Sequence, residues 1–295
     1  MSALPEEQEA AEAAPSRKLK IAKWDPGSIA RNCTMLLIGR RGTGKSSLLL
    51  DLAYHMAKNE TVDVGVGMSP TESSSECLGK FLPTTMIYSG YSEKKVQELM
   101  DSQKRAWDRG RGYHVLLCLD DCCFDKAILK TRTFRELMMN GRHRKITLIL
   151  TTQYCLDLPP AVRSNIDVVF MARDNIVSNR KRLYEQFAGF FACQNDFNKT
   201  FSALTTNFEV MVIDNKSTQS NALSDCVKWY KADVNLPRFR LGRPWVYRLH
   251  DRHFCDRAAE FARRRREEED RKRPIGAVVK GDPDGMTVVE SLVWH

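Results

Sequence analysis

An eight-residue loop in this sequence has the residue types and the spacing needed to hold a triphosphate. It reads GRRGTGKS over residues 39–46 and matches the phosphate-binding pattern G-x-x-x-x-G-K-[ST]. Its glycines let successive backbone N–H groups turn inward around an anion. Lys45 is expected to reach the β- and γ-phosphates, and the Ser46 hydroxyl to bind Mg²⁺. The sequence therefore predicts a nucleoside triphosphate site formed by Gly39, Arg40, Arg41, Gly42, Thr43, Gly44, Lys45, Ser46 and Ser47.

Two acidic residues and one amide are placed to complete such a site. The apolar run 115–119 ends in Asp120 and Asp121, 75 residues after the loop lysine. Asp120 is expected to hold Mg²⁺ through its water shell, and Asp121 to orient or deprotonate the attacking water. Gln153, after the next apolar run, is a candidate to bond the γ-phosphate or the water. Its other interpretation is an ordinary polar strand end.

Apolar runs alternate with helical patterns along most of the chain, which predicts an α/β fold. Alternation of this kind favours a mostly parallel central sheet with helices on both faces. Ligands bind such sheets at the carboxyl ends of the strands, where the loop, the aspartates and Gln153 all fall. Helices are expected after the loop, over 92–109 and 126–140, and around 183–191, with a turn at 69–73. The expected strands are 34–38, 62–68, 115–119, 146–150, 167–171, 208–213 and 227–230.

The net charge of +9 is concentrated in the middle of the 295-residue chain. Residues 1–17 carry four acids and one base, and residues 251–295 carry ten of each. The 233 residues between them hold 35 bases and 23 acids. A basic core suits a polyanionic partner beyond the nucleotide, such as nucleic acid. The alternative is a basic surface that serves only solubility.

Cysteine usage and hydropathy indicate the compartment. The nine cysteines are scattered, and no two clusters have zinc spacing, so reduced buried thiols in a reducing compartment are expected. The N-terminus lacks a signal peptide pattern, so the chain is not expected to be secreted. No apolar run reaches the roughly 18 residues that a membrane span requires.

Four segments are expected along the chain. Residues 1–17 are rich in Ala, Glu and Pro, which is typical of a disordered acidic tail. The P-loop domain is expected over 18–249. Residues 250–274 have charges at i,i+4 spacing that support a solvated helix, and the remaining residues, 275–295, are expected to form a tail.

Five motifs together resemble the genome-packaging ATPases of nucleocytoplasmic large DNA viruses, which belong to the FtsK/HerA branch of ring-forming P-loop motors. They are GRRGTGKSS, VLLCLDDC, MNGRHRKITLILTTQY, LPPAVRSNIDVVFMARDN and SNRKRLYEQFAGFF. The resemblance spans about residues 34–230. It implies an additional-strand, RecA-like sheet, ATP with Mg²⁺, double-stranded DNA, a pentameric or hexameric ring and a capsid or capsid-vertex partner. It also implies the host cytoplasm at the virus assembly site, or the virion, as the location.

The resemblance also implies roles for single residues. Lys45, Ser46, Asp120 and Gln153 match the phosphate, metal and sensor positions, and Arg142 or Arg144 lies in the stretch that supplies an arginine finger to a neighbouring subunit. The wider superfamily usually has Glu where this sequence has Asp121. Glu72 is therefore the reserve candidate for the catalytic base.

Alternatives to a packaging motor differ in partners or in class. A cellular-type DNA-pumping ATPase or helicase would have the same site, and a scaffold would bind ATP and assemble without translocating DNA. A guanine-nucleotide switch is disfavoured, because the stretch NKST at 215–218 lacks the aspartate of N-K-x-D. The first candidates for residues facing a DNA channel are Arg180, Lys181 and Arg182.

Overall fold

The computed structural model describes residues 19–155, 158–216, 222–254, 277–282 and 285–291. The chain divides into two units, Met1–Arg248 and Leu249–His295. The expected tail 1–17 and most of the expected charged helix, from residue 255 onward, lie outside the described residues. Within 275–295, where only a tail was expected, strands β9 (Ala277–Asp282) and β10 (Gly285–Ser291) pair antiparallel.

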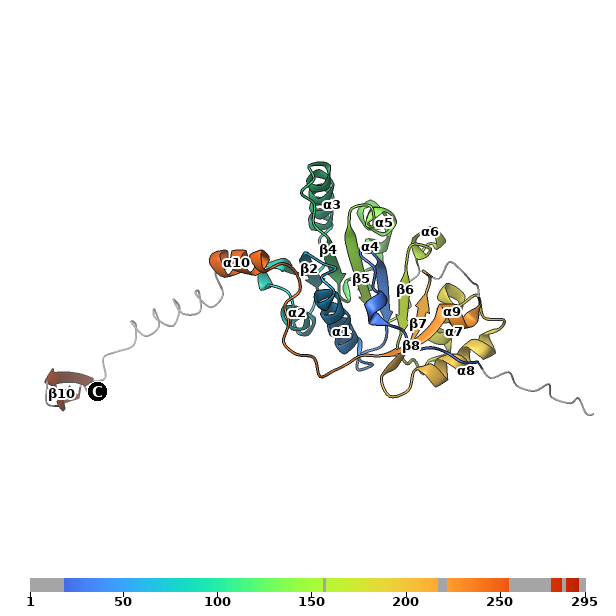
Figure 1. Cartoon of the computed structure of the whole chain (residues 1–295). Coiled ribbons are helices and arrows are strands. Elements are labelled where there is room, and N and C mark those ends of the chain that lie inside the picture. Colours follow the sequence, from blue (N-terminus) through green and yellow to red (C-terminus); the bar gives the residue numbers. More distant parts are fainter. Residues whose placement is uncertain (1–18, 156–157, 217–221, 255–276, 283–284, 292–295) are drawn as a thin grey trace, which may run out of the picture. The chain divides into compact units, whose positions relative to one another are not determined.

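An eight-stranded sheet forms the centre of the first unit (Figure 1). The strand order is β3-β2-β4-β5-β1-β6-β7-β8. All neighbours are parallel except β6–β7 and β7–β8, which are antiparallel. The strands are β1 Thr34–Ile38, β2 Val64–Ser69, β3 Ile87–Ser89, β4 Val115–Leu119, β5 Ile146–Thr152, β6 Val168–Met171, β7 Glu209–Asp214 and β8 Val227–Lys231.

This strand order confirms the predicted sheet type. β5 lies between the strand that leads into the phosphate loop, β1, and the strand that ends in the aspartates, β4. That inserted strand defines the additional-strand arrangement. Because β1, β4 and β5 are parallel, their carboxyl ends meet at one edge and bring the loop, Asp120 and Gln153 together.

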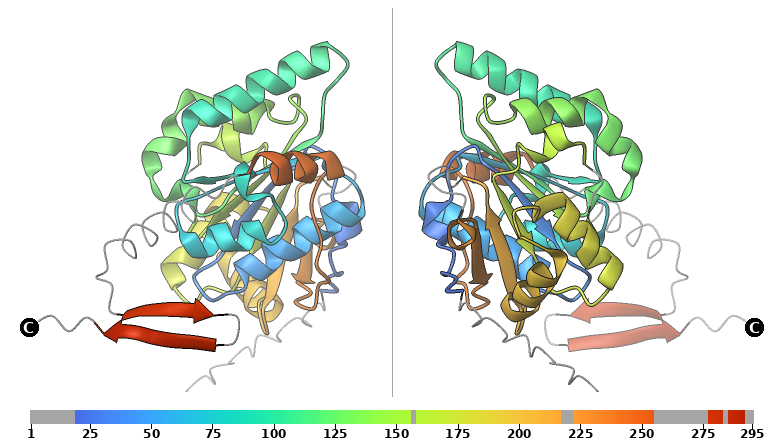
Figure 2. Two further views of the ribbon diagram at one scale, coloured as in Figure 1. Left: turned by 90° about the vertical axis from the view of Figure 1, so that its left-hand side faces the viewer. Right: turned by 90° about the vertical axis from the view of Figure 1, so that its right-hand side faces the viewer.

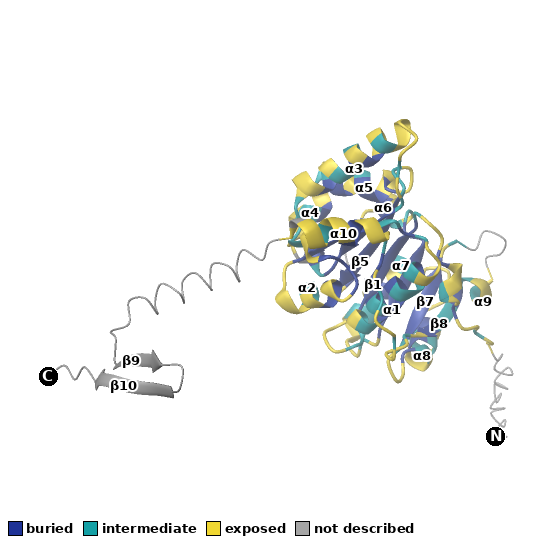
Figure 3. Cartoon of the chain, turned by 60° about the vertical axis from the view of Figure 1, so that its left-hand side comes forward, coloured by how far each residue is buried: buried dark blue, intermediate teal, exposed yellow. Residues whose placement is uncertain are grey.

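Helices cover both faces of the sheet, as Figure 2 shows. Residues of α1 and α2 pack in one core cluster, and residues of α3, α5, α7 and α8 pack in the other. The central strands β1, β4, β5 and β6 are buried throughout, whereas the edge strands β3 and β8 and the outer faces of the helices are partly exposed (Figure 3). The α-helices are α1 Lys45–Lys58, α2 Glu72–Gly79, α3 Glu93–Asp108, α4 Lys126–Lys130, α5 Arg132–Asn140, α6 Pro160–Arg163, α7 Val177–Phe187, α8 Gln194–Leu204, α9 Leu223–Cys226 and α10 Pro244–His253.

Three local predictions were wrong. The helix expected around 183–191 is α7, which ends at Phe187. The expected turn at 69–73 contains the start of α2, because Thr71 caps the helix by accepting a hydrogen bond from the Ser74 N–H at 3.4 Å. The expected helix 126–140 is two helices. Thr131 adopts an extended conformation between α4 and α5, and its hydroxyl accepts from the Phe134 N–H at 3.2 Å.

A buried carboxyl group joins the helix of the phosphate loop to the far edge of the sheet. Asp51, in α1, is fully buried, and the Tyr230 hydroxyl in β8 donates to its Oδ2 at 2.5 Å. His55 Nε2 lies 3.5 Å from the other carboxylate oxygen. Burial raises the pKa of Asp51, while the Tyr230 hydrogen bond and His55 oppose that rise.

The cysteines of the described residues are free thiols, and six of the eight are buried. Burial raises the pKa of Cys122 to about 12. The Cys122 thiol is therefore protonated at neutral pH and a poor nucleophile. None of the helices in the described ranges is long and apolar enough to cross a membrane.

Candidate functional site

The phosphate loop connects β1 to α1 and depends on glycine at two positions in particular. Gly44 adopts φ +89°, a left-handed conformation that favours glycine. A Cβ on Gly39 would lie 2.6 Å from Thr43 Oγ1 and 2.7 Å from Ala172 Cβ, too close for any side chain. Since Ala172 follows β6, the loop can pack against the neighbouring strand only because residue 39 is glycine.

Lys45 begins α1 and extends its ammonium group along the loop. Its Nζ donates to the Gly39 carbonyl at 2.5 Å and lies 3.9 Å from Asp121 Oδ1. Burial lowers the pKa of Lys45, and the negative charges of Asp121 and Asp120 oppose that shift. A bound triphosphate would add further negative charge beside the ammonium and stabilise its protonated form.

Thr151, near the end of β5, positions both aspartates. Its hydroxyl donates to Asp120 Oδ1 and accepts from the Asp121 backbone N–H at 3.0 Å. Asp121 has a left-handed backbone, with φ +49°, which is strained for a residue with a side chain. The hydrogen bond to Thr151 helps to hold that conformation. Thr151 was not predicted from the sequence, although its position two residues before Gln153 placed it at the same edge.

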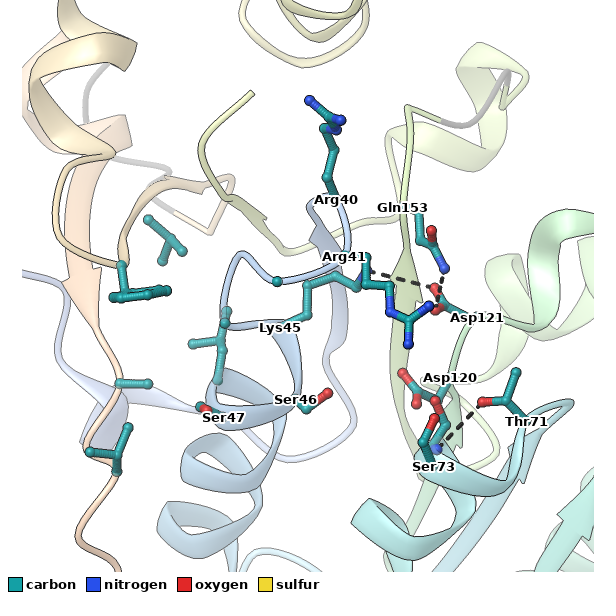
Figure 4. Close-up of a pocket in the computed structure, with 18 of the residues that line it drawn as sticks. Arg40, Arg41, Lys45, Ser46, Ser47, Thr71, Ser73, Asp120, Asp121 and Gln153 are labelled. Carbon is teal, nitrogen blue, oxygen red and sulfur yellow. Dashed lines mark hydrogen bonds and ion pairs between the residues drawn. The ribbon is translucent and has the colours of Figure 1, made fainter. Parts of the chain in front are cut away.

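Gln153 approaches Asp121 from the neighbouring strand end. Its Nε2 donates to Asp121 Oδ2 at 2.9 Å, and among the described residues the other oxygen of Asp121 is buried without a hydrogen-bond donor. Gln153 thus holds one carboxylate oxygen, while the other, 3.9 Å from the Lys45 ammonium, has no hydrogen bond within the described ranges and could serve as a general base. Figure 4 shows Gln153 and Asp121 facing Lys45, with Arg41 directed toward the aspartates and Arg40 pointing away.

These side chains line a cavity of about 830 Å³. Most of the predicted site residues are part of its wall, whereas Gly39 and Thr43 shape the loop behind it. Glu72, the reserve base, does not line the cavity, although its neighbours Thr71 and Ser73 do. Residues that were not predicted from the sequence complete the lining: Leu48, Thr71, Ser73, Ser74, Phe208, Val210, Lys231, Ala232 and Val234.

The cavity offers oxygen ligands of the kind that Mg²⁺ prefers. The Ser46 hydroxyl and the Asp120 carboxylate both line it, and Asp120 is only 6% exposed. They could hold the ion together with phosphate oxygens and water. Within the described residues, no group of three or more His, Cys, Asp or Glu side chains could hold a metal without a nucleotide.

Arg142 and Arg144 precede β5 and so lie at the amino ends of the strands, at the end of the sheet opposite to the nucleotide cavity. Arg142 pairs with Asp167, whose other oxygen accepts from the Thr34 backbone N–H at 2.8 Å. Arg144 lies 3.7 Å from Glu136. Neither arginine lines the nucleotide cavity of its own chain.

A second cavity, of about 460 Å³, is lined by residues that follow β5 and by residues of α4, α5 and α7. Four of its lining residues are basic: Lys126, Lys130, Arg135 and Arg182. Within the described part of the chain, none of the four pairs with a carboxylate, and no acidic residue lines the cavity. Tyr154 also lines it and directly follows Gln153, so the two cavities adjoin along the chain.

The family profile described as "ATPase family associated with various cellular activities (AAA)" matches residues 35–174. Uncharacterized protein 088R of Invertebrate iridescent virus 3 is 33% identical over 70% of this chain and 80% of its own length. Uncharacterized protein L437 of Acanthamoeba polyphaga mimivirus is 31% identical over 73% of this chain and 78% of its own.

The chain belongs to a family of P-loop ATPases of nucleocytoplasmic large DNA viruses. Its fold is also similar to a crystal structure of B204, described as the DNA-packaging ATPase from Sulfolobus turreted icosahedral virus. That likeness covers 70% of this chain and 100% of B204 at 18% identity, with a TM-score of 0.51, and it bears on the fold alone. The family assignment and the loop geometry together make this viral protein an ATP-binding enzyme that hydrolyses ATP.

Proposed function

We propose that this viral ATPase uses ATP hydrolysis to move double-stranded DNA and packages a viral genome into a capsid. The observation that carries the proposal is the basic cavity beside Gln153. Its four cations, which have no carboxylate partner among the described residues, suit the phosphates of a nucleic acid backbone, which bind mainly through charge neutralisation. Tyr154 lines this cavity, and its neighbour in the chain, Gln153, donates to Asp121. DNA bound in the cavity would therefore lie beside the residue that follows Gln153.

The proposal includes a cofactor, an assembly and a location. Mg²⁺ would be held by Ser46 and Asp120, where it would neutralise charge on the phosphates. The chain would act as a homo-oligomeric ring of five or six subunits, with Arg142 or Arg144 acting on a neighbour's site. The capsid or its vertex would be the docking partner, and the host cytoplasm at the virus assembly site, or the virion, the place of action.

The deciding experiment measures ATP hydrolysis with and without linear duplex DNA. We expect duplex DNA to stimulate turnover, and DNA binding to tolerate any sequence and to weaken steeply with salt. A scaffold that binds ATP without translocating would hydrolyse at the same rate with and without DNA. A cellular-type helicase would separate the strands of a tailed duplex, which a packaging motor leaves paired.

The basic cavity itself can be tested by removing two of its charges. Lys126→Ala combined with Arg182→Ala should weaken duplex binding and reduce the slope of log affinity against log salt by about 1 for each phosphate that is no longer neutralised. Lys104→Ala, on the exposed face of α3, is the matched control and should leave the slope unchanged. Equal slopes for all three proteins would remove this cavity from the DNA path.

A further inference from the structure

The wall of the nucleotide cavity formed by β7, β8 and the residues that flank these strands is apolar and unusually exposed. Phe208 is 70% exposed and Val234 is 73% exposed, the largest exposures among the big apolar side chains of the described residues. Both line the cavity, together with Val210 and Ala232. Large apolar surface left open beside a ligand site is expected to be covered when the ligand binds.

The backbone before Phe208 is strained in a way that places this ring at the cavity. Asn207 and Phe208 have φ values of +49° and +62°, both in the left-handed region. Such conformations are strained for residues with a side chain and persist where the surroundings impose them. The Glu209 N–H donates to the Thr206 carbonyl at 2.7 Å and closes the turn.

The ring lies directly beside the phosphate loop. A Cβ built on Gly44 would be 3.5 Å from Phe208 Cδ1, which is van der Waals distance. Gly44 immediately precedes Lys45, so any nucleotide whose phosphates bind the loop has its sugar and base within reach of this wall. Figure 4 shows the labelled aspartates and Gln153 gathered on one side of the loop, where the terminal phosphate would lie.

We propose that Phe208 and Val234 form the base subsite, in which the nucleobase stacks on the Phe208 ring. Among the described residues of this wall, Lys231 alone has a polar side chain. Aromatic stacking accepts any base, most strongly the larger purines. The site therefore selects purine nucleotides as a class and separates ATP from GTP only weakly. This inference rests on the phosphate loop binding the triphosphate.

The test compares ATP with inorganic tripolyphosphate, which carries the three phosphates without a base. In Phe208→Ala of the full chain, ATP affinity should fall about tenfold, the reduction expected for one stacking interaction, while tripolyphosphate affinity stays within twofold. Phe208→Trp should restore ATP affinity. Because Phe208 is mostly exposed, truncating its side chain removes little core packing, and unchanged tripolyphosphate binding confirms that the loop is intact.

Val234→Ala should lower ATP affinity about threefold, while Val177→Ala, equally apolar and 63% exposed but outside the cavity, should not change it. Equal reductions for ATP and tripolyphosphate in Phe208→Ala, or no reduction for either, would overturn the subsite. Failure of tripolyphosphate to bind the unmodified protein would instead contradict the phosphate site.

Base selectivity provides a second test of the same site. The kcat/KM values for ATP and GTP should agree within about tenfold, and that for CTP should be lower than both, because the described wall has no positioned polar side chain that rejects either purine. A preference for ATP over GTP above about 100-fold would show that polar groups read the base edge, and would overturn the inference of a purine-class site.

Discussion

Lys45, Asp121 and Gln153 form a continuous set of polar contacts across the floor of the nucleotide cavity. Lys45 lies 3.9 Å from one oxygen of Asp121, and Gln153 holds the other at 2.9 Å. The shorter side chain at position 121, compared with the usual glutamate, is accompanied by a left-handed backbone that alters where the carboxylate points. The geometry favours Asp121 over Glu72 as the base, because Glu72 does not line the cavity.

Lys45→Ala should abolish ATP hydrolysis and leave the fold intact. The ammonium contacts a loop carbonyl and a carboxylate at the cavity rather than the apolar core. Steady-state turnover and the thermal unfolding midpoint measure the two effects separately. Turnover within about tenfold of the unmodified protein would contradict the role of this lysine.

Asp121→Asn should lower turnover by about 10²–10⁴, the usual value of general-base assistance, and still bind ATP with Mg²⁺. Glu72→Gln is the matched comparison and should hydrolyse ATP at the normal rate. The reverse outcome, with a normal Asp121→Asn and an inactive Glu72→Gln, would move the base to Glu72. Single-turnover kinetics with nucleotide binding measured in parallel distinguish these results.

The part of the site that follows from a short motif could be predicted from the sequence, and the part assembled by backbone conformation could not. The lysine, serine and two aspartates follow contiguous patterns with fixed spacing. Phe208 was interpreted as the first residue of a strand, because its aromatic type favours strands. Asparagine is common in the left-handed region, but nothing in the residue type of Phe208 indicates the left-handed backbone that aims its ring at the cavity.

Helix α1 carries the site and is attached to a strand far from it in the sequence. Asp51 is directed inward by the helix, and Tyr230, at the edge strand β8, donates to its carboxylate. A buried carboxyl group of this kind favours its protonated form in the folded state. The helix position is thereby coupled to the protonation of a single group.

Asp51→Asn should change how stability depends on pH. Burial raises the folded pKa of Asp51 above its unfolded value, so the folded state holds this proton over a range where the unfolded state has released it. The stabilisation from the bound proton of Asp51 is complete below the pKa of the unfolded state, about 3.9. It is lost as the pH rises through the pKa of the folded state. The asparagine variant should therefore become more stable relative to the unmodified protein as pH rises above about 4. Urea unfolding at successive pH values measures the difference, and parallel curves would contradict it.

Elements with a clear apolar pattern were predicted within one or two residues, whereas those whose bounds depend on capping were not. β1, β4 and α3 agree with their expected ranges because their apolar period is unambiguous over a full element. α2 was missed since Pro70 and several serines suggest a turn, and the capping role of Thr71 depends on a conformation that the sequence does not specify. The break at Thr131 was missed for the same reason.

At the scale of the assembly, the position of Arg142 allows one sharp test. It lies at the amino end of the sheet, away from its own nucleotide cavity, and its side chain is 59% exposed. We predict that Arg142→Ala is inactive alone and that mixing it with inactive Lys45→Ala subunits restores partial activity. In a mixed ring, the intact nucleotide site of an Arg142→Ala subunit would face the intact Arg142 of a Lys45→Ala subunit. An arginine finger contributes roughly 10³–10⁵ in rate.

The pairing of Arg142 with Asp167 provides the control. Asp167→Asn breaks the same ion pair and leaves the arginine present, so it should retain hydrolysis. If Asp167→Asn is as inactive as Arg142→Ala, or if mixed rings form and no ratio restores activity, Arg142 acts only within its own chain. Arg144, which lies near Glu136, is then the next arginine to replace and test in the same mixing experiment.

The central place of β1 in the sheet has a consequence for how the chain is made. Both of its neighbours, β5 and β6, come later in the sequence, and Ile146 follows Ile38 by 108 residues. During synthesis, the phosphate loop emerges from the ribosome long before either strand that supports it. A nascent chain that ends before residue 146 therefore has the whole loop motif and no rigid loop. Until β5 is synthesised, the apolar strand 34–38 has neither of its neighbours, so the strand that leads into the ATP-binding loop is exposed to aggregation during synthesis.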